Sequence, residues 1–160
     1  MSDAKFAAFK VPPVEKSVLV PCAPVRAFQA FTAEIAEWWP IKTHSVAQAK
    51  AKSVRIEPAV GGRVVETAED GSECEWGRVL TWSPPHGFSM TWHPGRTAET
   101  HQVLELSFIA EAGATRVRLV HRGWEILGER AQAARDDYAG GWEKIITIDF
   151  ARYFERAARS

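Results

Sequence analysis

The chain is 160 residues long and carries 20 Lys and Arg residues against 20 Asp and Glu residues, so its formal charge at pH 7 is zero. This length fits one domain that buries most of the surface exposed by its unfolded form. The balanced charge disfavours a nucleic-acid partner, because such a face needs a basic stripe to replace phosphate counterions. We expect a single domain over residues 15–160, preceded by a short arm over residues 1–14.

The N-terminal region contains no apolar run long enough for a signal peptide or a membrane span. We therefore expect a cytoplasmic protein that does not cross a membrane. The two cysteines, Cys22 and Cys74, lack the spacing of metal ligands, and a reducing compartment would keep them as thiols. Cys22 stands close to a predicted helix start, which lowers the pKa of a thiol; a packing role is the alternative.

The first part of the chain predicts a strand followed by two short helices. An apolar stretch within residues 15–21 forms the strand, which Pro21 ends. Pro24 suits the first turn of a helix, and Thr32 is expected to cap a second helix that stops before Pro40. Val25, Phe28 and Phe31 would fall on one face of the first helix.

The middle of the chain alternates between apolar and polar side chains and is divided by turn signals such as Asp70-Gly71. This pattern predicts a meander of about six antiparallel strands. The strands are expected near residues 54–56, 63–67, 73–82, 88–92, 101–108 and 116–121. Alternation along the third of them would place on one face Cys74, Trp76, Arg78, Leu80 and Trp82.

The last part of the chain has the period of a long helix with a wide apolar stripe. The stripe comprises Tyr138, Trp142, Ile145, Ile146, Asp149, Phe150 and Tyr153. Gly140 and Gly141 would together cost roughly 1–2 kcal/mol in a helix interior, which predicts either a close approach of the helix to the sheet or room kept for a ligand. Asp136 and Asp137 are expected near the helix start, where they suit the helix dipole.

Several short motifs carry a resemblance to a known family. They are Val20 to Phe28 with Phe31-Thr32, Trp38-Trp39-Pro40, Gly61-Gly62-Arg63, Trp76-Gly77-Arg78-Val79-Leu80, Trp82-Ser83-Pro84-Pro85, His121-Arg122-Gly123-Trp124 and Tyr138 to Trp142. From residue 15 onward the chain resembles the START-related, Bet v 1-like superfamily (SRPBCC), and within it domains similar to the C-terminal domain of the activator of the heat-shock-protein-90 ATPase. The resemblance implies an α+β helix-grip fold. In that fold a curved antiparallel β-sheet wraps around a long C-terminal helix, and two short helices follow the first strand.

Tryptophan is unusually frequent, with seven residues in the chain. Each buried indole removes roughly 150–250 Å² from water, so the tryptophans indicate either an aromatic-walled cavity between sheet and helix or a solid aromatic core. Trp38 and Trp39 would form a lid over that cavity or a plug at the end of the core. The residues expected to line a cavity are Phe31, Trp38, Trp39, Trp76, Arg78, Trp92, Phe108, Trp124, Tyr138 and Trp142.

Arg78 and His121 are polar residues in phase with apolar neighbours. A buried guanidinium needs a partner, either an internal carboxylate such as Glu66 or Glu75 or the acidic group of a ligand. His121 is a weak candidate for a general base, since its ordinary pKa lies near neutral pH; the alternative is a strand end that reaches solvent. The remaining histidines, His44, His86, His93 and His101, lack the spacing of a metal site, so neither a metal nor a cofactor is expected.

Three functions remain open from the sequence. The first is binding of an apolar small molecule without catalysis. The second is an enzyme of the cyclase, hydratase or hydrolase kind found in the superfamily, in which Arg78 orients an anionic group and His121 moves a proton. The third is a module that contacts a chaperone, as the resemblance to the ATPase activator implies. The exposed edges of an open sheet also leave formation of a homodimer open, and the sequence does not identify the ligand.

Overall fold

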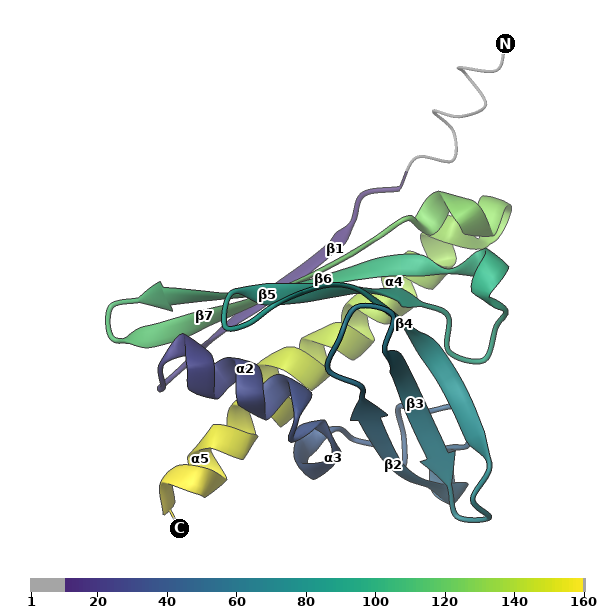
Figure 1. Ribbon diagram of the computed structural model, residues 1–160. Helices are drawn as coiled ribbons and strands as arrows, with labels where there is room; N and C mark the ends of the chain where they lie inside the picture. Colours follow the sequence, from purple (N-terminus) through teal and green to yellow (C-terminus); the bar gives the residue numbers. More distant parts are fainter. Residues whose placement is uncertain (1–10, 160) are drawn as a thin grey trace.

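The computed structural model describes residues 11–159 and consists of a curled antiparallel sheet against which a long C-terminal helix packs (Figure 1). The sheet has seven strands in the order β1-β7-β6-β5-β4-β3-β2. Its strands are β1 (Val14–Val20), β2 (Ala51–Ile56), β3 (Arg63–Ala68), β4 (Glu73–Ser83), β5 (Gly87–Trp92), β6 (Gln102–Glu111) and β7 (Ala114–Arg122). The α+β helix-grip fold is therefore confirmed. Most of the predicted N-terminal arm lies outside the described residues.

The helices occupy two places in the sequence. Between β1 and β2 lie α2 (Pro24–Thr32), α3 (Ile35–Trp38) and the 3₁₀ turn η1 (Gln48–Lys50). A second 3₁₀ turn, η2 (Ala98–Thr100), precedes β6. After β7 the chain continues through η3 (Trp124–Arg130), α4 (Ala131–Lys144), the π-helical segment η4 (Ile145–Phe150) and α5 (Ala151–Arg159). In Figure 1, α4, η4 and α5 form one long helix, yellow-green to yellow, that runs beneath the sheet, and η3 is the short green helix that precedes it.

The alternation predicted for the second half of the meander is confirmed. Strands β5, β6 and β7 each bury every second side chain, because one face of these antiparallel strands packs on the core and the other meets solvent. The buried residues are Phe88, Met90, Trp92, Gln102, Leu104, Leu106, Phe108, Thr115, Val117, Leu119 and His121.

The alternation predicted for β4 is wrong between Trp76 and Trp82, whereas these two tryptophans both pack against the core as predicted. The pairing of β3 with β4 shifts register between Val64 and Val65, and the pairing of β4 with β5 shifts between Val79 and Thr81. Each irregularity adds a residue to one strand and so reverses which side chains face inward. As a result Val79 is buried, while Arg78 and Leu80 point to solvent.

The prediction that Thr32 caps the second short helix is also wrong. Thr32 is the last residue of α2, and its hydroxyl donates back to the carbonyl oxygen of Phe28 at 2.7 Å. Helix α3 instead begins after Glu34. A threonine hydroxyl can satisfy a carbonyl one turn earlier in its own helix as well as it can cap a following one, and the sequence alone does not separate these uses.

The interior between the sheet and the long helix is filled by the protein's own side chains. Phe31 packs against Trp38 and Phe150, with ring centroids 5.1 Å and 5.3 Å apart, and Trp38 lies 4.7 Å from Phe150. The void left between Phe31, Met90, Trp142 and their neighbours has a volume of only about 20 Å³. At its centre, therefore, the grip is a solid aromatic core.

Candidate functional site

A hollow of about 420 Å³ opens beside the filled core, between α4, the loop after α3 and the loop after β5. The loop after α3 contributes Trp39, Thr43, His44, Ser45 and Val46, and the sheet and the loop after β5 contribute Trp76, Trp92, Pro94 and Gly95. The helix contributes Asp137, Tyr138, Gly141, Trp142 and Ile145. The volume lies within the range of small-molecule sites.

Four tryptophans form the wall of this cavity. Trp76 on β4 lies 5.2 Å from Trp39 and 5.6 Å from Trp92, measured between ring centroids. Trp142 on α4 lies 5.3 Å from Trp92 and 5.8 Å from Trp39. Such tilted and edge-to-face contacts are the favoured geometries of aromatic pairs. The wall is thus a rigid, apolar surface drawn from the sheet, the helix and the loop between α3 and β2.

The loop that forms the rim is attached to this wall by one buried carboxylate. Glu66 on β3 accepts the backbone N–H groups of Val46 and Ala47, both at 2.7 Å, and the indole N–H of Trp76 at 2.9 Å. A buried carboxylate is tolerated when hydrogen bonds satisfy it. Glu66 therefore fixes the position of the rim relative to Trp76.

His44 lies on the same loop and lines the cavity. Its backbone carbonyl accepts the indole N–H of Trp39 at 2.8 Å, and its Nδ1 lies 2.8 Å from the hydroxyl of Thr43. Burial and the positive charge of Lys144 lower the pKa of the imidazole below its ordinary 6.5, although Asp149 acts in the opposite direction. The neutral form of the ring therefore predominates at pH 7.

The helix side of the cavity explains one of the two glycines in α4. A Cβ atom at Gly141 would lie 3.9 Å from Cδ2 of His44, whereas one at Gly140 would meet no atom within 4 Å. The glycine pair does not mark a close approach of helix to sheet, and that alternative is wrong. Gly141 lines the cavity, so its missing side chain leaves room there.

Asp137 occupies a different position from the one predicted. Helix α4 begins at Ala131, so Asp136 and Asp137 lie beyond the first turn instead of at the helix start. Asp137 is exposed and lines the cavity one turn before Gly141. Among the lining residues that the structure describes, it is the one acidic side chain, and none is Lys or Arg.

The residues predicted to bind a ligand separate into two groups. Trp39, Trp76, Trp92, Tyr138 and Trp142 line the cavity. Phe31, Trp38 and Phe108 instead belong to the filled core, and the indole of Trp124 stacks on His121 at a centroid distance of 4.0 Å. The paired tryptophans have divided roles: Trp38 packs in the core, and Trp39 contributes to the cavity wall.

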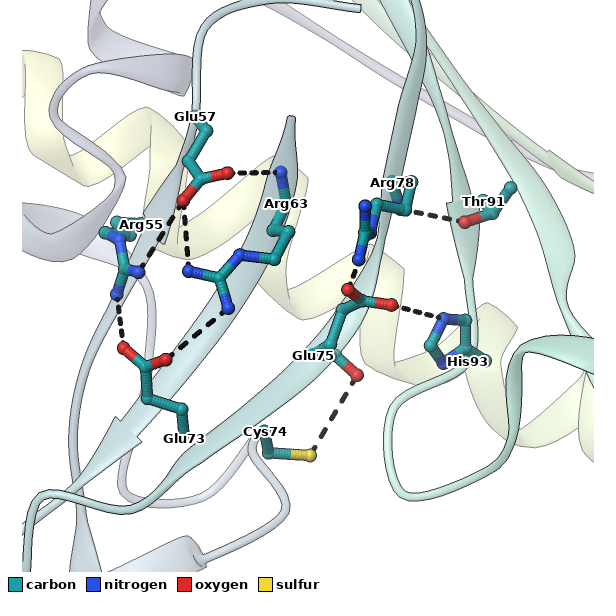
Figure 2. Close-up of polar contacts among 9 residues, drawn as sticks. All are labelled: Arg55, Glu57, Arg63, Glu73, Cys74, Glu75, Arg78, Thr91 and His93. Carbon is teal, nitrogen blue, oxygen red and sulfur yellow. Dashed lines mark hydrogen bonds and ion pairs between the residues drawn. The ribbon is translucent and has the colours of Figure 1, made fainter. Parts of the chain in front are cut away.

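Arg78 does not point into the grip, which corrects the prediction that it is buried. Its side chain is 54% exposed, and its Nε donates to Glu75 at 2.7 Å (Figure 2). The other oxygen of Glu75 lies 3.4 Å from Nε2 of His93, a contact too long for a firm hydrogen bond. Arg78 therefore belongs to an ion pair on the outer face of the sheet, and the predicted partner Glu75 is the correct one.

His121 is fully buried, so the alternative of a strand end that reaches solvent is wrong. Its Nδ1 accepts the indole N–H of Trp142 at 2.9 Å, which places the proton on Nε2, and Nε2 donates to Oε1 of Gln102 at 3.0 Å. Burial, with a smaller effect from Arg96, lowers the pKa of His121 to about 3. Both ring nitrogens are occupied and the residue does not line the cavity, which argues against a general base at this position.

Cys22 shows no activation by the helix that follows it. Burial raises the pKa of its thiol, and the opposing effect of Arg26 is smaller. This direction supports a packing role.

The polar part of the cavity has no clear signal in the sequence. Four of the lining residues follow the proline that ends α3, in a segment without periodicity: Thr43, His44, Ser45 and Val46. The sequence pattern therefore does not indicate which way their side chains face. Glu66 lies in a strand whose burial pattern is disturbed by a register shift. The one available signal is Gly141, because a glycine inside a helix can leave room for a ligand beside it.

The curled sheet, the helix beneath it and the side cavity define a helix-grip domain of the SRPBCC type. A family model described as "Activator of Hsp90 ATPase homolog 1-like protein" matches residues 21–155. The chain therefore belongs to this family, as its motifs predicted. No curated protein matches the chain.

Solved structures agree with this assignment. The anthrahydroquino-γ-pyrone synthase Txn09 is 30% identical, with 90% of this chain and 97% of that chain covered and a TM-score of 0.58. The AHSA1-like protein from Aeromonas hydrophila is 19% identical, with coverages of 92% and 95% and a TM-score of 0.65. DynU16, a putative protein of the dynemicin biosynthetic locus, is 16% identical, with coverages of 91% and 48% and a TM-score of 0.68. At these lower identities the last two support the fold alone.

Within the described part of the chain, none of the helices combines the length and the apolar character that crossing a bilayer requires.

Proposed function

We propose that the protein binds a planar, largely apolar small molecule in the cavity beside α4. The observation that carries this proposal is a cavity of about 420 Å³ walled by Trp39, Trp76, Trp92 and Trp142 in a domain whose centre is otherwise filled. Rigid aromatic surfaces with a few polar groups at the rim are typical of small-molecule sites. Because the described lining contains no Lys or Arg, an uncharged ligand suits it better than a fatty acid.

The two neighbouring glycines of α4 provide a matched test. Gly141→Leu would place a side chain in the cavity beside His44, whereas Gly140→Leu would add the same side chain where no atom lies within 4 Å. Both changes favour the helix similarly. Tryptophan fluorescence during titration with a panel of planar aromatic compounds should show saturable quenching in the wild type and in Gly140→Leu. In Gly141→Leu the affinity should fall at least tenfold.

Mass spectrometry of the protein purified without denaturation would complement the titration, because a carried-over molecule would identify the chemical class directly. Equal affinity in the two leucine variants would exclude the cavity as the site. A wild type that binds no member of a broad panel and carries no molecule through purification would contradict the proposal.

A second candidate function is catalysis on an aromatic ligand of the polyketide type. It is favoured by the 30% identity to the anthrahydroquino-γ-pyrone synthase Txn09 over 90% of this chain. The predicted roles of Arg78 and His121 in such a reaction find no support in their positions. The third function, contact with a chaperone, rests on the family resemblance alone and stays a prediction.

A further inference from the structure

We infer that His44 is a proton-transferring base of the cavity, positioned to take a proton from a planar ligand that lies against the tryptophan wall. The inference rests on the proposed function, because it assigns a reactive group to the same site. His44 is the histidine that lines the cavity.

The position of His44 is fixed from several directions. Its backbone N–H donates to the carbonyl of Pro40 at 2.9 Å, and its own carbonyl accepts the indole N–H of Trp39 at 2.8 Å. Two residues further on, the carboxylate of Glu66 holds the backbone N–H of Val46 at 2.7 Å. A reactive side chain needs such a rigid support to stay in a productive position.

The imidazole itself is oriented by contacts on two sides. Nδ1 lies 2.8 Å from the hydroxyl of Thr43. On the other side of the ring, Cδ2 faces Gly141, where a Cβ atom would lie 3.9 Å from it. Nε2 is bonded to Cδ2 in the ring, so it lies near the helix side of the cavity. Among the described residues no hydrogen bond reaches Nε2, which leaves that nitrogen available to a ligand.

The charges around His44 suit a base. Lys144 lowers the pKa of the imidazole together with burial, while Asp149, which pairs with Lys144 at 2.7 Å, opposes this effect. Asp137 lies four residues before Gly141 on the same face of α4, at a separation of about 6 Å along the helix. Asp137 and His44 line the same cavity, so the Asp137 carboxylate is the second group there that can accept a proton from a ligand.

The other histidines are less suitable. Both ring nitrogens of His121 are bonded within the core. His93 is buried beside Glu75, and His86 and His101 lie in turns; none of them lines the cavity. The inference therefore distinguishes one histidine from the others and can be tested by single substitutions.

The probe we choose is 5-nitrobenzisoxazole, a small, planar and uncharged aromatic compound. A base removes the proton from its C3 carbon, the C–H electron pair becomes part of a nitrile group, and the N–O bond breaks to release a coloured phenolate. The proton stays on the base and later passes to water, so no further reactant is needed. The reaction reports a base that reaches a bound planar ligand, while tryptophan quenching by the same probe reports binding independently.

We expect saturable elimination by the wild type, an at least tenfold lower rate at saturation in His44→Gln, and an unchanged rate in the control His86→Gln. The wild-type rate should rise with pH to a plateau, with the midpoint of the rise below pH 6.5, because the pKa of His44 lies below that ordinary value. Asp137→Asn tests the other proton acceptor of the cavity and should lower the rate at saturation less than His44→Gln does. The quenching affinity should stay within a few fold in all three variants.

The outcomes separate the two proposals. Saturable binding with a rate that does not depend on His44 would overturn the assignment of the base but leave the binding site standing. Loss of the rate in Asp137→Asn but not in His44→Gln would identify Asp137 as the base and likewise overturn it. If the wild type fails to bind the probe or any other planar compound, the proposed function and the inference fail together.

Discussion

The indole N–H of Trp76 donates to the carboxylate of Glu66 at 2.9 Å, and this contact joins the cavity wall to its rim. The same carboxylate holds the backbone of Val46 and Ala47. A single side chain of β3 thus binds both a tryptophan on β4 and the loop between α3 and β2. The position of the rim relative to the wall therefore depends on this carboxylate.

Replacing Glu66 by Ala should therefore destabilise the protein and disturb the cavity. Three N–H donors would lose their acceptor, and each buried donor left unsatisfied costs about 1–3 kcal/mol when it cannot reach water. We expect the free energy of unfolding in urea to fall by about 2–4 kcal/mol. The control Glu69→Ala removes an exposed carboxylate with a single 3.4 Å contact to Lys42 and should cost less than about 0.5 kcal/mol. Equal losses in the two variants would contradict the role assigned to Glu66.

His121 should make the stability depend on pH. Its pKa is about 3 in the folded protein and near 6.5 in the unfolded chain, so between these values the unfolded state binds more protons. Stability contributed by neutral His121 is thus complete above pH 6.5 and is lost as the pH falls toward 3. The slope should approach about 1.4 kcal/mol per pH unit in the acidic part of this window.

Urea unfolding at several pH values between 4 and 7 would measure this dependence in the wild type and in His121→Gln. The glutamine can still accept from Trp142 and donate to Gln102, so the variant should fold but lose this contribution to the slope. A pH dependence that is the same in both proteins would show that His121 is not the group responsible.

The fold was largely predictable because it is encoded in local patterns. Alternation along residues 102–108 predicts a strand with one buried face, and Asp70-Gly71 predicts a tight turn; the structure has both. The inward positions of Trp92 and Trp142 follow from the same periodicities. The motifs that indicated the SRPBCC family are themselves short local segments of this kind.

The site was less predictable because it depends on departures from those patterns. The register shifts beside Val64 and Val79 reverse the faces of β4, so Arg78 lies outside although its sequence position indicated the interior. His44 lies in a segment without periodicity, and only tertiary contacts place it over Gly141. The sequence left open whether the tryptophans enclose a cavity or fill a solid core. The structure has both features, because the centre is solid and the cavity lies beside it.

Arg78 should be dispensable for ligand binding. Its side chain is 54% exposed and pairs with Glu75 outside the cavity, and an exposed ion pair contributes at most about 1 kcal/mol. Arg78→Ala should thus lower the free energy of unfolding by less than about 1 kcal/mol and leave the quenching affinity for planar compounds unchanged. A large loss of affinity in a variant with normal stability would restore the interpretation in which this guanidinium anchors the ligand.

Gly77 should be among the least replaceable residues, because the backbones of β4 and β5 approach each other closely there. A Cβ atom at this position would lie 1.7 Å from the carbonyl oxygen of Thr91, and backbone cannot move aside as a flexible side chain can. Gly77→Ala should therefore separate the two strands and reduce the free energy of unfolding by at least about 3 kcal/mol. It should also weaken ligand binding, since Trp76 stands next to the displaced segment and lines the cavity.

Gly71→Ala provides the comparison for that change. Gly71 has a φ of +88°, but a Cβ atom there would meet nothing within 4 Å. Its replacement should cost only the strain of a left-handed residue, about 1–2 kcal/mol, and leave binding intact. Thermal or urea unfolding of both variants beside the wild type would separate steric exclusion from backbone strain. If Gly77→Ala proved no worse than Gly71→Ala, the close approach of β4 to β5 would not be what makes Gly77 hard to replace.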